Sequence, residues 1–375
     1  MSSLLLFGIC FILHCTSYAR ATLRVCYYGA WAAKDGLQPQ HIDSSLCTHM
    51  ILAFAELDAN FTNIKTGPSF PVQEMMQFTH LKRNNPHLKT LISLGGWIMG
   101  SLPFMTLVAN EVTMRAFATN AVKFLRAHDF DGIDIDWEFP NERGSEIEDK
   151  ANFIKLLEIL HTAFVNEPNR GNKERLLLTA AVAPTEERII RSYNVQGLIK
   201  YLDLMGLITY DYHGEWENSV NVHNALYSTT DESVDGSLKY WLSQGVPKNK
   251  VLVGIPTYGR KFLLNDSTNG TIGASSNGGG DISYGEICKM IKTHQITPVT
   301  LQTEKVPYFH HKNQWITYED VTSITEKAGY IRSQGVAGAM VWAINLDDYA
   351  GVCGSGTFPL LKALRKRLST DAIVG

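Results

Sequence analysis

The fold and the site are both decided by one stretch, Phe130-Asp131-Gly132-Ile133-Asp134-Ile135-Asp136-Trp137-Glu138. Its second half alternates apolar and acidic residues, with the period of two that is typical of a β-strand. On a strand, Asp134, Asp136 and Glu138 face one side while the Ile and Trp side chains face the other. Three carboxyl groups on one face raise one another's pKa and resist joint ionisation. Because such crowding does not favour stability, we interpret the stretch as a functional site.

Strands and helices alternate on both sides of this acidic strand. The segment 113–128 has the apolar spacing of an amphipathic helix and leads directly into it. Seven further strands are expected at 24–30, 49–55, 88–94, 176–182, 204–209, 251–257 and 338–342. Further helices are expected at 72–84, 152–166, 195–201, 236–244, 322–334 and 360–368. This alternation predicts parallel strands closed into a (β/α)8 TIM barrel, which 375 residues can form as one domain.

The seventh and eighth strands are about eighty residues apart, far more than a barrel loop requires. This interval holds a Gly/Ser/Asn-rich loop at 273–280, a short helix around 284–292, and strand-like segments at 306–309 and 314–317. We interpret it as a small α+β domain, about 261–334, inserted between strands 7 and 8. The barrel, part of a catalytic domain spanning 22–370, would then consist of 22–260 and 335–370.

The amino terminus has the features of a secretory signal peptide. A short apolar run, 4–12, precedes the small-residue motif Ala19-Arg20-Ala21. We expect cleavage after Ala21, giving a signal peptide of residues 1–21, with cleavage after Ala19 and an uncleaved anchor as alternatives. The protein is therefore expected to be secreted and extracellular.

Cysteines and glycosylation motifs agree with that compartment. Beyond the signal peptide, which contains Cys10 and Cys15, four cysteines remain: Cys26, Cys47, Cys288 and Cys353. Three pairings are possible, and proximity in the chain favours Cys26–Cys47 with Cys288–Cys353. Candidate N-glycosylation motifs begin at Asn60, Asn265 and Asn269.

Charge and motif content exclude several classes of protein. A net charge of −3 gives no reason to expect nucleic acid or a membrane as partner, and we expect a monomer. The acidic strand lacks the glycine and glutamate spacing of an EF-hand, and its Asp-x-Asp element is too common to indicate a sugar-nucleotide transferase. The histidines at 49, 213, 223, 310 and 311 have no metal-ligand spacing, and no phosphate-binding glycine loop is present. We therefore expect no metal and no cofactor.

Aromatic residues fall where the predicted strands end, which in a TIM barrel is the site-bearing mouth. The predicted strand ends carry Tyr27, Phe54, Trp97, Glu138, Tyr210-Asp211, Tyr258 and Trp342. Aromatic faces stack on sugar rings, and carboxyl groups bind hydroxyls and transfer protons. For any single ring, ordinary core packing remains the alternative. Their joint placement with the carboxyl groups indicates a carbohydrate cleft.

The stretch 131–138 resembles the D-G-x-D-x-D-W-E signature of glycoside hydrolase family 18, the chitinases and chitinase-like lectins. Further blocks resemble that family in order, at 47–55, 91–97, 209–216, 256–260 and 338–343, so the likeness covers nearly the whole mature chain. It is strongest to the group of animal acidic mammalian chitinases and chitotriosidases. The resemblance implies a barrel with an inserted domain and retaining hydrolysis of β-1,4-linked N-acetylglucosamine polymers, with chitin or chitooligosaccharide as substrate.

The resemblance also implies roles for individual residues. Glu138 would be the general acid and base, and the substrate's own acetamido group would be the nucleophile. Asp136 would hydrogen-bond Glu138 and the acetamido N–H, and Asp134 would share a proton with Asp136. Tyr210 and Asp211 would position the acetamido group. The substrate-binding residues would be Tyr27, Phe54, Gly95, Gly96, Trp97, Ile98, Phe139, Ile208, Thr209, Trp216, Arg260 and Trp342.

Several positions depart from the family pattern. Ile98, Ile208, Phe139 and Asn345 stand where relatives usually have Asn, Met, Tyr and Asp. No linker or cysteine-rich chitin-binding module follows the barrel, so we expect better action on soluble oligomers than on crystalline chitin. The serious alternative is a chitinase-like lectin that binds without turnover. Such lectins usually lack the general acid, whereas this chain keeps Glu138.

Overall fold

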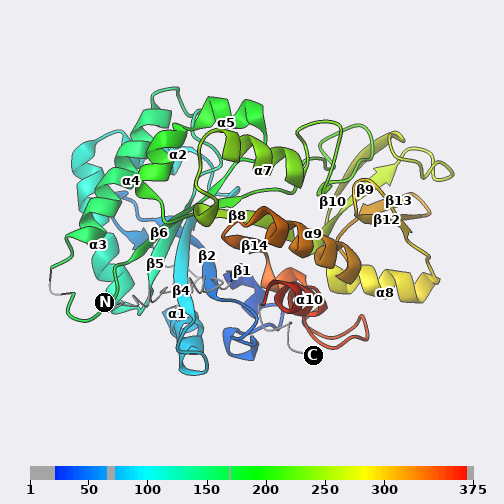
Figure 1. The fold of residues 1–375 in the computed structure, drawn as a ribbon, viewed down its shortest axis with the longest axis horizontal. Coiled ribbons are helices and arrows are strands. Elements are labelled where there is room, and N and C mark those ends of the chain that lie inside the picture. Colours follow the sequence, from blue (N-terminus) through cyan, green and yellow to red (C-terminus); the bar gives the residue numbers. More distant parts are fainter. Residues whose placement is uncertain (1–21, 66–71, 169, 370–375) are drawn as a thin grey trace, which may run out of the picture.

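The computed structural model describes residues 22–65, 72–168 and 170–369, and its centre is a closed parallel barrel (Figure 1). The barrel order is β1-β14-β8-β7-β6-β5-β4-β2, and β1 also pairs with β2, which closes the ring. Its strands are β1 (Leu23–Gly29), β2 (His49–Leu57), β4 (Lys89–Gly95), β5 (Gly132–Asp136), β6 (Leu177–Val182), β7 (Leu204–Leu207), β8 (Val251–Pro256) and β14 (Gly338–Trp342). The predicted (β/α)8 barrel is confirmed. A short strand, β3 (Ile64–Lys65), pairs antiparallel with β2 at its edge.

Helices cover the outside of the barrel. They are α1 (Val72–Thr79), α2 (Leu102–Val108), α3 (Glu111–Ala127), α4 (Asp149–Val165), α5 (Glu186–Ser192), α6 (Val195–Tyr201), α7 (Val234–Ser243), α9 (Val321–Gln334) and α10 (Pro359–Leu368). Side-chain caps from Asn110, Asn194, Ser233 and Asp320 start α3, α6, α7 and α9 by accepting from free backbone N–H groups. All seven predicted helices are present, and α2 and α5 are additional short ones. No helix in the described ranges combines the length and apolar character that a membrane crossing requires.

The acidic strand β5 separates two packed layers, as its period of two predicts. Ile133, Ile135 and Trp137 are buried against the surrounding helices, where the Trp137 ring stacks on Phe104 of α2 with centroids 5.0 Å apart. Asp134 and Asp136 point the other way, into the barrel. The outward face stabilises the fold by burying apolar area, which leaves the inward face for polar chemistry.

The inserted domain is a five-stranded antiparallel sheet in the order β10-β9-β13-β12-β11 with one helix. Its elements are β9 (Tyr258–Leu264), β10 (Ser276–Ser283), α8 (Tyr284–His294), β11 (Val299–Thr300), β12 (Pro307–His311) and β13 (Gln314–Thr317). The predicted α+β insertion is thus present, with β9 beginning three residues before the expected start. Helix α9 lies outside this sheet and packs beside α10 on the barrel (Figure 1).

The expectation of a loop at 273–280 was wrong for its second half, which forms most of β10. Gly278, Gly279 and Gly280 have φ of 81°, 150° and 146°, and the register with β9 shifts between Ser276 and Gly279. A Cβ on Gly279 would lie 1.8 Å from the Lys261 carbonyl oxygen. Glycine is therefore required here for close strand approach, although its composition is typical of a loop.

Two disulfides have the favoured pairing. Cys26 of β1 bonds Cys47, which lies just before β2, and Cys288 of α8 bonds Cys353 in the segment after β14. The second bond ties the inserted domain to the barrel. The predicted signal peptide, with Cys10 and Cys15, lies outside the described residues.

Candidate active site

Asp134 is the deepest of three carboxyl groups that lie in a row along the inner face of β5, and hydrogen bonds hold it in place. Its two oxygens accept from three hydroxyls: Tyr27 at 2.7 Å, Ser93 at 2.8 Å and Thr179 at 2.6 Å. Ser93 and Thr179 occupy the register positions beside Asp134 on β4 and β6. Burial raises the pKa of Asp134, and these three hydrogen bonds offset part of the rise.

Asp136 lies one step higher and is nearly unpartnered. It is 5% exposed, and its Oδ1 has no hydrogen-bond partner among the described residues. Burial, together with the charges of Glu138 and Asp134, raises its pKa well above the usual range. The hydrogen bond expected from Asp136 to Glu138 is not formed, nor is one between Asp134 and Asp136, within the part of the chain that is described. The three groups are coupled in this structure through charge alone.

Glu138 ends the row at the carboxyl-terminal mouth of the barrel, directly after β5. Burial raises its pKa to about 7, and the nearby Asp211 carboxylate adds to the rise. Two guanidinium groups, Arg143 and Arg188, act in the opposite direction. A carboxyl group that titrates near neutrality can both donate and accept a proton under ordinary conditions, which is what general acid–base chemistry requires.

Asp211 is the permanently charged member of the site. Its Oδ1 accepts from His223 Nδ1 at 3.2 Å, Tyr258 at 2.6 Å and Arg260 Nε at 2.8 Å, and its Oδ2 accepts from Arg260 Nη2 at 2.5 Å. Burial alone would raise the pKa of Asp211, but the hydrogen bonds from His223 and Arg260 hold it well below its usual range. The neighbouring Tyr210 is 7% exposed, and its hydroxyl contacts the sulfur of Met340 at 3.7 Å.

Aromatic rings surround these polar groups. The half-buried Trp342 stacks on Phe54 with centroids 5.3 Å apart, and the Tyr27 ring meets it edge-on at 5.4 Å. Trp97 is 57% exposed, with the Arg143 guanidinium 3.9 Å from its ring centroid. Trp216 is equally exposed and carries Arg260 at 4.9 Å. The exposed ring faces leave apolar surface at the mouth for a ligand to cover.

Arg143 joins Trp97 to the row of carboxyl groups. Besides covering the ring, its Nη1 donates to the Trp97 carbonyl at 2.6 Å and to the Glu138 carbonyl at 3.3 Å. Arg188 covers the buried Phe139 ring at 4.9 Å and pairs with Glu142. Both arginines therefore contact the segment that follows β5 directly, and their charges also act on Glu138.

The remaining predicted site residues lie at different depths. Gly96 N donates to the Asp136 carbonyl at 2.8 Å, and a Cβ on Gly95 would lie 2.1 Å from that same oxygen, so both glycines allow β4 to approach β5 closely. Thr209 is fully buried and donates to the Gly254 carbonyl at 2.8 Å. Ile208 is half-buried, and Ile98 is 97% exposed beside Trp97. The candidate glycosylation residues Asn60, Asn265 and Asn269 are all exposed.

Several residues that contact the candidate site residues were missed from the sequence. Thr179 could have been found, because it is the single hydroxyl within an otherwise apolar strand, and Ser93 because it interrupts the apolar run of β4 between Ile92 and Leu94. The sequence groups His223 only with four other histidines that lack metal-ligand spacing, and it lies in an irregular segment where no periodicity indicates which way a side chain points. Within the described residues, no three His, Cys, Asp or Glu side chains converge as metal ligands would.

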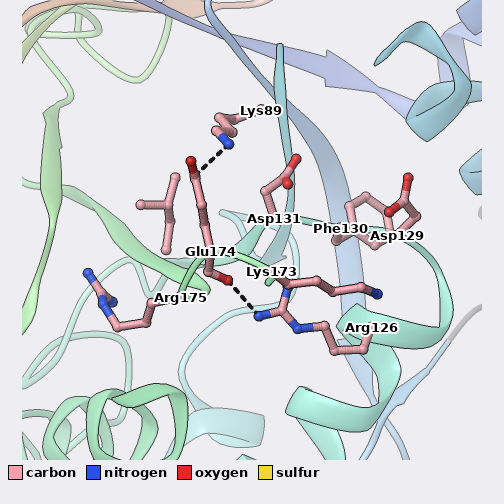
Figure 2. A pocket seen from close by; sticks show the side chains of 9 residues that line it. Lys89, Arg126, Asp129, Phe130, Asp131, Lys173, Glu174 and Arg175 are labelled. Atoms are coloured by element: carbon pink, nitrogen blue, oxygen red, sulfur yellow. Dashed lines mark hydrogen bonds and ion pairs between the residues drawn. The ribbon is translucent and has the colours of Figure 1, made fainter. Parts of the chain in front are cut away.

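A second, charged pocket of about 160 Å³ lies at the opposite end of the barrel (Figure 2). Lys89 pairs there with the Glu174 carboxylate at 2.6 Å, and Arg126 donates to the Glu174 carbonyl at 2.8 Å. Asp131 accepts from Thr90 N at 2.8 Å, which ties the start of β5 to β4. Since these charges satisfy one another at the amino-terminal ends of the strands, this pocket belongs to the stabilising face of the barrel.

Comparisons with known proteins identify the family. The profile described as "Glycosyl hydrolases family 18" matches residues 24–347. Chitotriosidase-1 of Mus musculus is 36% identical over 375 aligned residues, covering 94% of this chain and 79% of that protein. The group IV chitinase of Ostrinia furnacalis in complex with allosamidin superposes with a TM-score of 0.88 at 34% identity, covering 92% of this chain and 98% of that chain. Human YKL-39, a pseudo-chitinase with retained chitooligosaccharide binding, gives 0.86 at 34% identity, covering 93% and 100%.

The barrel, its acidic row and these relatives define a glycoside hydrolase. The chain belongs to glycosyl hydrolase family 18.

Proposed function

We propose that this protein is a secreted chitinase that hydrolyses β-1,4 linkages of N-acetylglucosamine polymers and oligomers with retention. The observation that carries the proposal is Glu138, a mouth carboxyl group whose pKa is raised to about 7. Its neighbour Asp211 keeps a low pKa and stays charged. Two carboxyl groups whose pKa values are pushed apart are the usual sign of an acid–base site.

In the first step Glu138 gives its proton to the glycosidic oxygen as the C1–O bond breaks. The carbonyl oxygen of the substrate's 2-acetamido group attacks C1 from the other face and forms an oxazolinium ion. In the second step the Glu138 carboxylate takes a proton from water, which attacks C1 and releases the sugar with its original configuration. No protein nucleophile is needed, which fits a row in which Asp134 is bound by three hydroxyls.

Asp136 is the group best placed to bind the acetamido N–H. Its Oδ1 is buried without a partner among the described residues, so a donor from the substrate would satisfy it. In its ionised form Asp136 would also stabilise the positive oxazolinium ion. Tyr210 and Asp211 would hold the acetamido group on the opposite side, and the Trp342 ring would support the sugar.

Secretion rests on the predicted signal peptide and on the two disulfides, which persist in oxidising compartments. Use of the sequons at Asn60, Asn265 and Asn269 is part of the same proposal. The alternative function is a chitooligosaccharide-binding lectin, and the exposed rings of Trp97 and Trp216 would serve it equally well. The presence of Glu138 with a raised pKa favours the enzyme.

The test is hydrolysis of a chromogenic chitotriose-type substrate by the wild type and by Glu138→Gln. We expect the variant to lose at least about a thousandfold in kcat, because the general acid is removed, while it still binds oligosaccharide. Calorimetric titration with an unmodified oligomer measures that binding. An inert wild type that binds oligomers would establish the lectin, and a variant that keeps its rate would refute the role of Glu138.

A further inference from the structure

His223 lies in the chain segment that connects β7 to α7. Its side chain is completely buried and contacts Asp211, the charged residue of the site. Its Nδ1 lies 3.2 Å from Asp211 Oδ1, and its ring packs on Tyr258 with centroids 5.3 Å apart. Its backbone carbonyl accepts from Tyr212 N at 3.1 Å. The residue is therefore held to the Asp211 segment by both main chain and side chain.

The surroundings of His223 select one protonation state. An ionised carboxylate only accepts hydrogen bonds, so Nδ1 must carry the hydrogen. Its Nε2 is buried with no partner among the described residues, so a proton there would be an unpaired buried charge. Burial, reinforced by the charges of Arg260 and Lys327, outweighs the opposing effect of Asp211 and lowers the pKa of His223 to about 4. The ring is thus neutral and fixed as the Nδ1–H tautomer.

The two oxygens of Asp211 carry unequal numbers of hydrogen bonds, and the contact with His223 adds to the difference. Oδ1 accepts from His223, Tyr258 and Arg260, whereas Oδ2 accepts, among the residues that the structure describes, only from Arg260. A carboxylate oxygen has about two lone-pair positions, so Oδ1 is saturated. Oδ2 is the oxygen that keeps the capacity to accept from another donor.

The segment behind His223 is fixed by a buried ion pair. The next residue, Asn224, donates through Nδ2 to Glu319 at 2.7 Å, and its carbonyl accepts from Lys327 of α9. Glu319 and Lys327 pair with each other, and neither side chain is exposed. Residues from the barrel's last helical repeat therefore set the position of the imidazole.

We propose that His223 is a positioning residue for the reaction, holding Asp211 by Oδ1 so that Oδ2 alone is presented to the substrate's acetamido group. The inference rests on the proposed function. It gives the histidine no contact with substrate: its effect passes entirely through the orientation of Asp211.

The test compares two substitutions at this position. His223→Phe keeps a ring and removes the donor, whereas His223→Asn places an amide N–H close to where Nδ1 stood. We expect His223→Phe to lower kcat by about tenfold to a hundredfold with little change in KM, the effect of losing one charge-assisted hydrogen bond. His223→Asn should recover most of that rate. His161→Phe, on the outer helix α4, is the matched control and should leave kcat unchanged.

The folded fraction of each variant and the protonation state of His223 are measured in separate experiments. Circular dichroism gives the folded fraction of each variant, and rates are expressed per folded molecule. Nitrogen-15 spectra of the wild-type imidazoles should show one protonated and one bare nitrogen for His223 from about pH 5 to 8. An imidazolium near pH 6, or a folded His223→Phe with wild-type kcat, would overturn the inference. If the wild type neither hydrolyses nor binds oligosaccharide, the proposed function fails instead, and the nitrogen spectra still decide the tautomer.

Discussion

The hydroxyl of Tyr27 on β1 donates to Oδ2 of Asp134 on β5 across 2.7 Å of the barrel interior. Tyr27 is only 2% exposed, so its contribution to the site passes through this carboxyl group. Tyr27→Phe would keep the ring packing against Trp342 and remove one of three donors to Asp134. The pKa of Asp134 should then rise, and we expect kcat to fall by about tenfold, the effect of losing one hydrogen bond to a charged group. Steady-state kinetics on a soluble oligomer measures this.

The adjacent tyrosine provides the control. Tyr28 points to the outer face of β1, where its hydroxyl donates to the Leu37 carbonyl at 2.7 Å. Tyr28→Phe should cost about 1 kcal/mol of unfolding free energy and leave kcat unchanged. Equal losses of activity in the two variants would mean that Tyr27 acts through stability alone.

The wild-type enzyme should lose activity as the pH rises through about 7. Glu138 must be protonated to act as general acid, and burial raises its pKa to about 7. Because kcat/KM reports the free enzyme, its alkaline limb should have its midpoint near that pH. A profile flat from about pH 5 to 9 would contradict the assignment of Glu138 as the titrating acid.

Removing Arg143 should move that limb to higher pH. Its positive charge favours ionised Glu138 and so lowers the pKa of that group. Arg143→Met keeps an apolar chain over Trp97 but removes the charge and the hydrogen bonds to the Trp97 and Glu138 carbonyls. We expect an upward shift of the alkaline limb and a higher KM. Arg115→Met, which breaks only an exposed pair with Glu111, should change neither.

Features that depend on neighbouring residues could be predicted from the sequence, and contacts between residues far apart in the chain could not. The acidic strand was predictable because a period of two assigns its side chains to two faces without reference to anything else. Thr179 has to meet Asp134 across 45 residues of sequence. That meeting depends on strand register, which only the closed barrel sets.

The parts that were missed have physical reasons. Strand β10 was expected to be partly loop because glycines carry no side-chain pattern, and the close approach of the Lys261 carbonyl that requires Gly279 is visible only in the paired strands. His223 lies twelve residues from Asp211, yet the irregular chain between them gives no direction to either side chain. Arg143 reaches Trp97 across 46 residues, through a turn that forms only after β4 and β5 are paired.

The Cys288–Cys353 disulfide should contribute much of the stability of the joint between the inserted domain and the barrel. It closes a loop with a sequence separation of 65 residues, for which chain entropy predicts about 4 kcal/mol. Replacing both cysteines by Ala should lower the unfolding free energy by about that amount in a urea titration. The shorter Cys26–Cys47 loop, with a separation of 21, predicts about 3 kcal/mol. If removal of Cys26–Cys47 cost more unfolding free energy than removal of Cys288–Cys353, loop entropy would not be the main source of the stabilisation.

Asp136→Asn tests whether the acidic row acts as a coupled unit. The Glu138 charge raises the pKa of Asp136, so the protons of the two groups leave in steps that belong to the pair. Asn keeps the size of the side chain and an oxygen that can accept the acetamido N–H, but it removes the negative charge. Because the repulsion between two carboxylates acts on both, Glu138 would then ionise with only the Asp211 anion nearby, its pKa would fall, and the alkaline limb of kcat/KM would move to lower pH.

The same substitution should lower kcat by about a hundredfold, because a neutral amide stabilises the positive oxazolinium ion less than a carboxylate does. A lower kcat and a shifted pH profile are both needed to support the coupling of Asp136 with Glu138. A slower variant with an unchanged pH profile would assign Asp136 to transition-state charge alone, with Glu138 tuned by burial and by Asp211. A shifted profile at full rate would mean that Asp136 sets the protonation of Glu138 without touching the substrate.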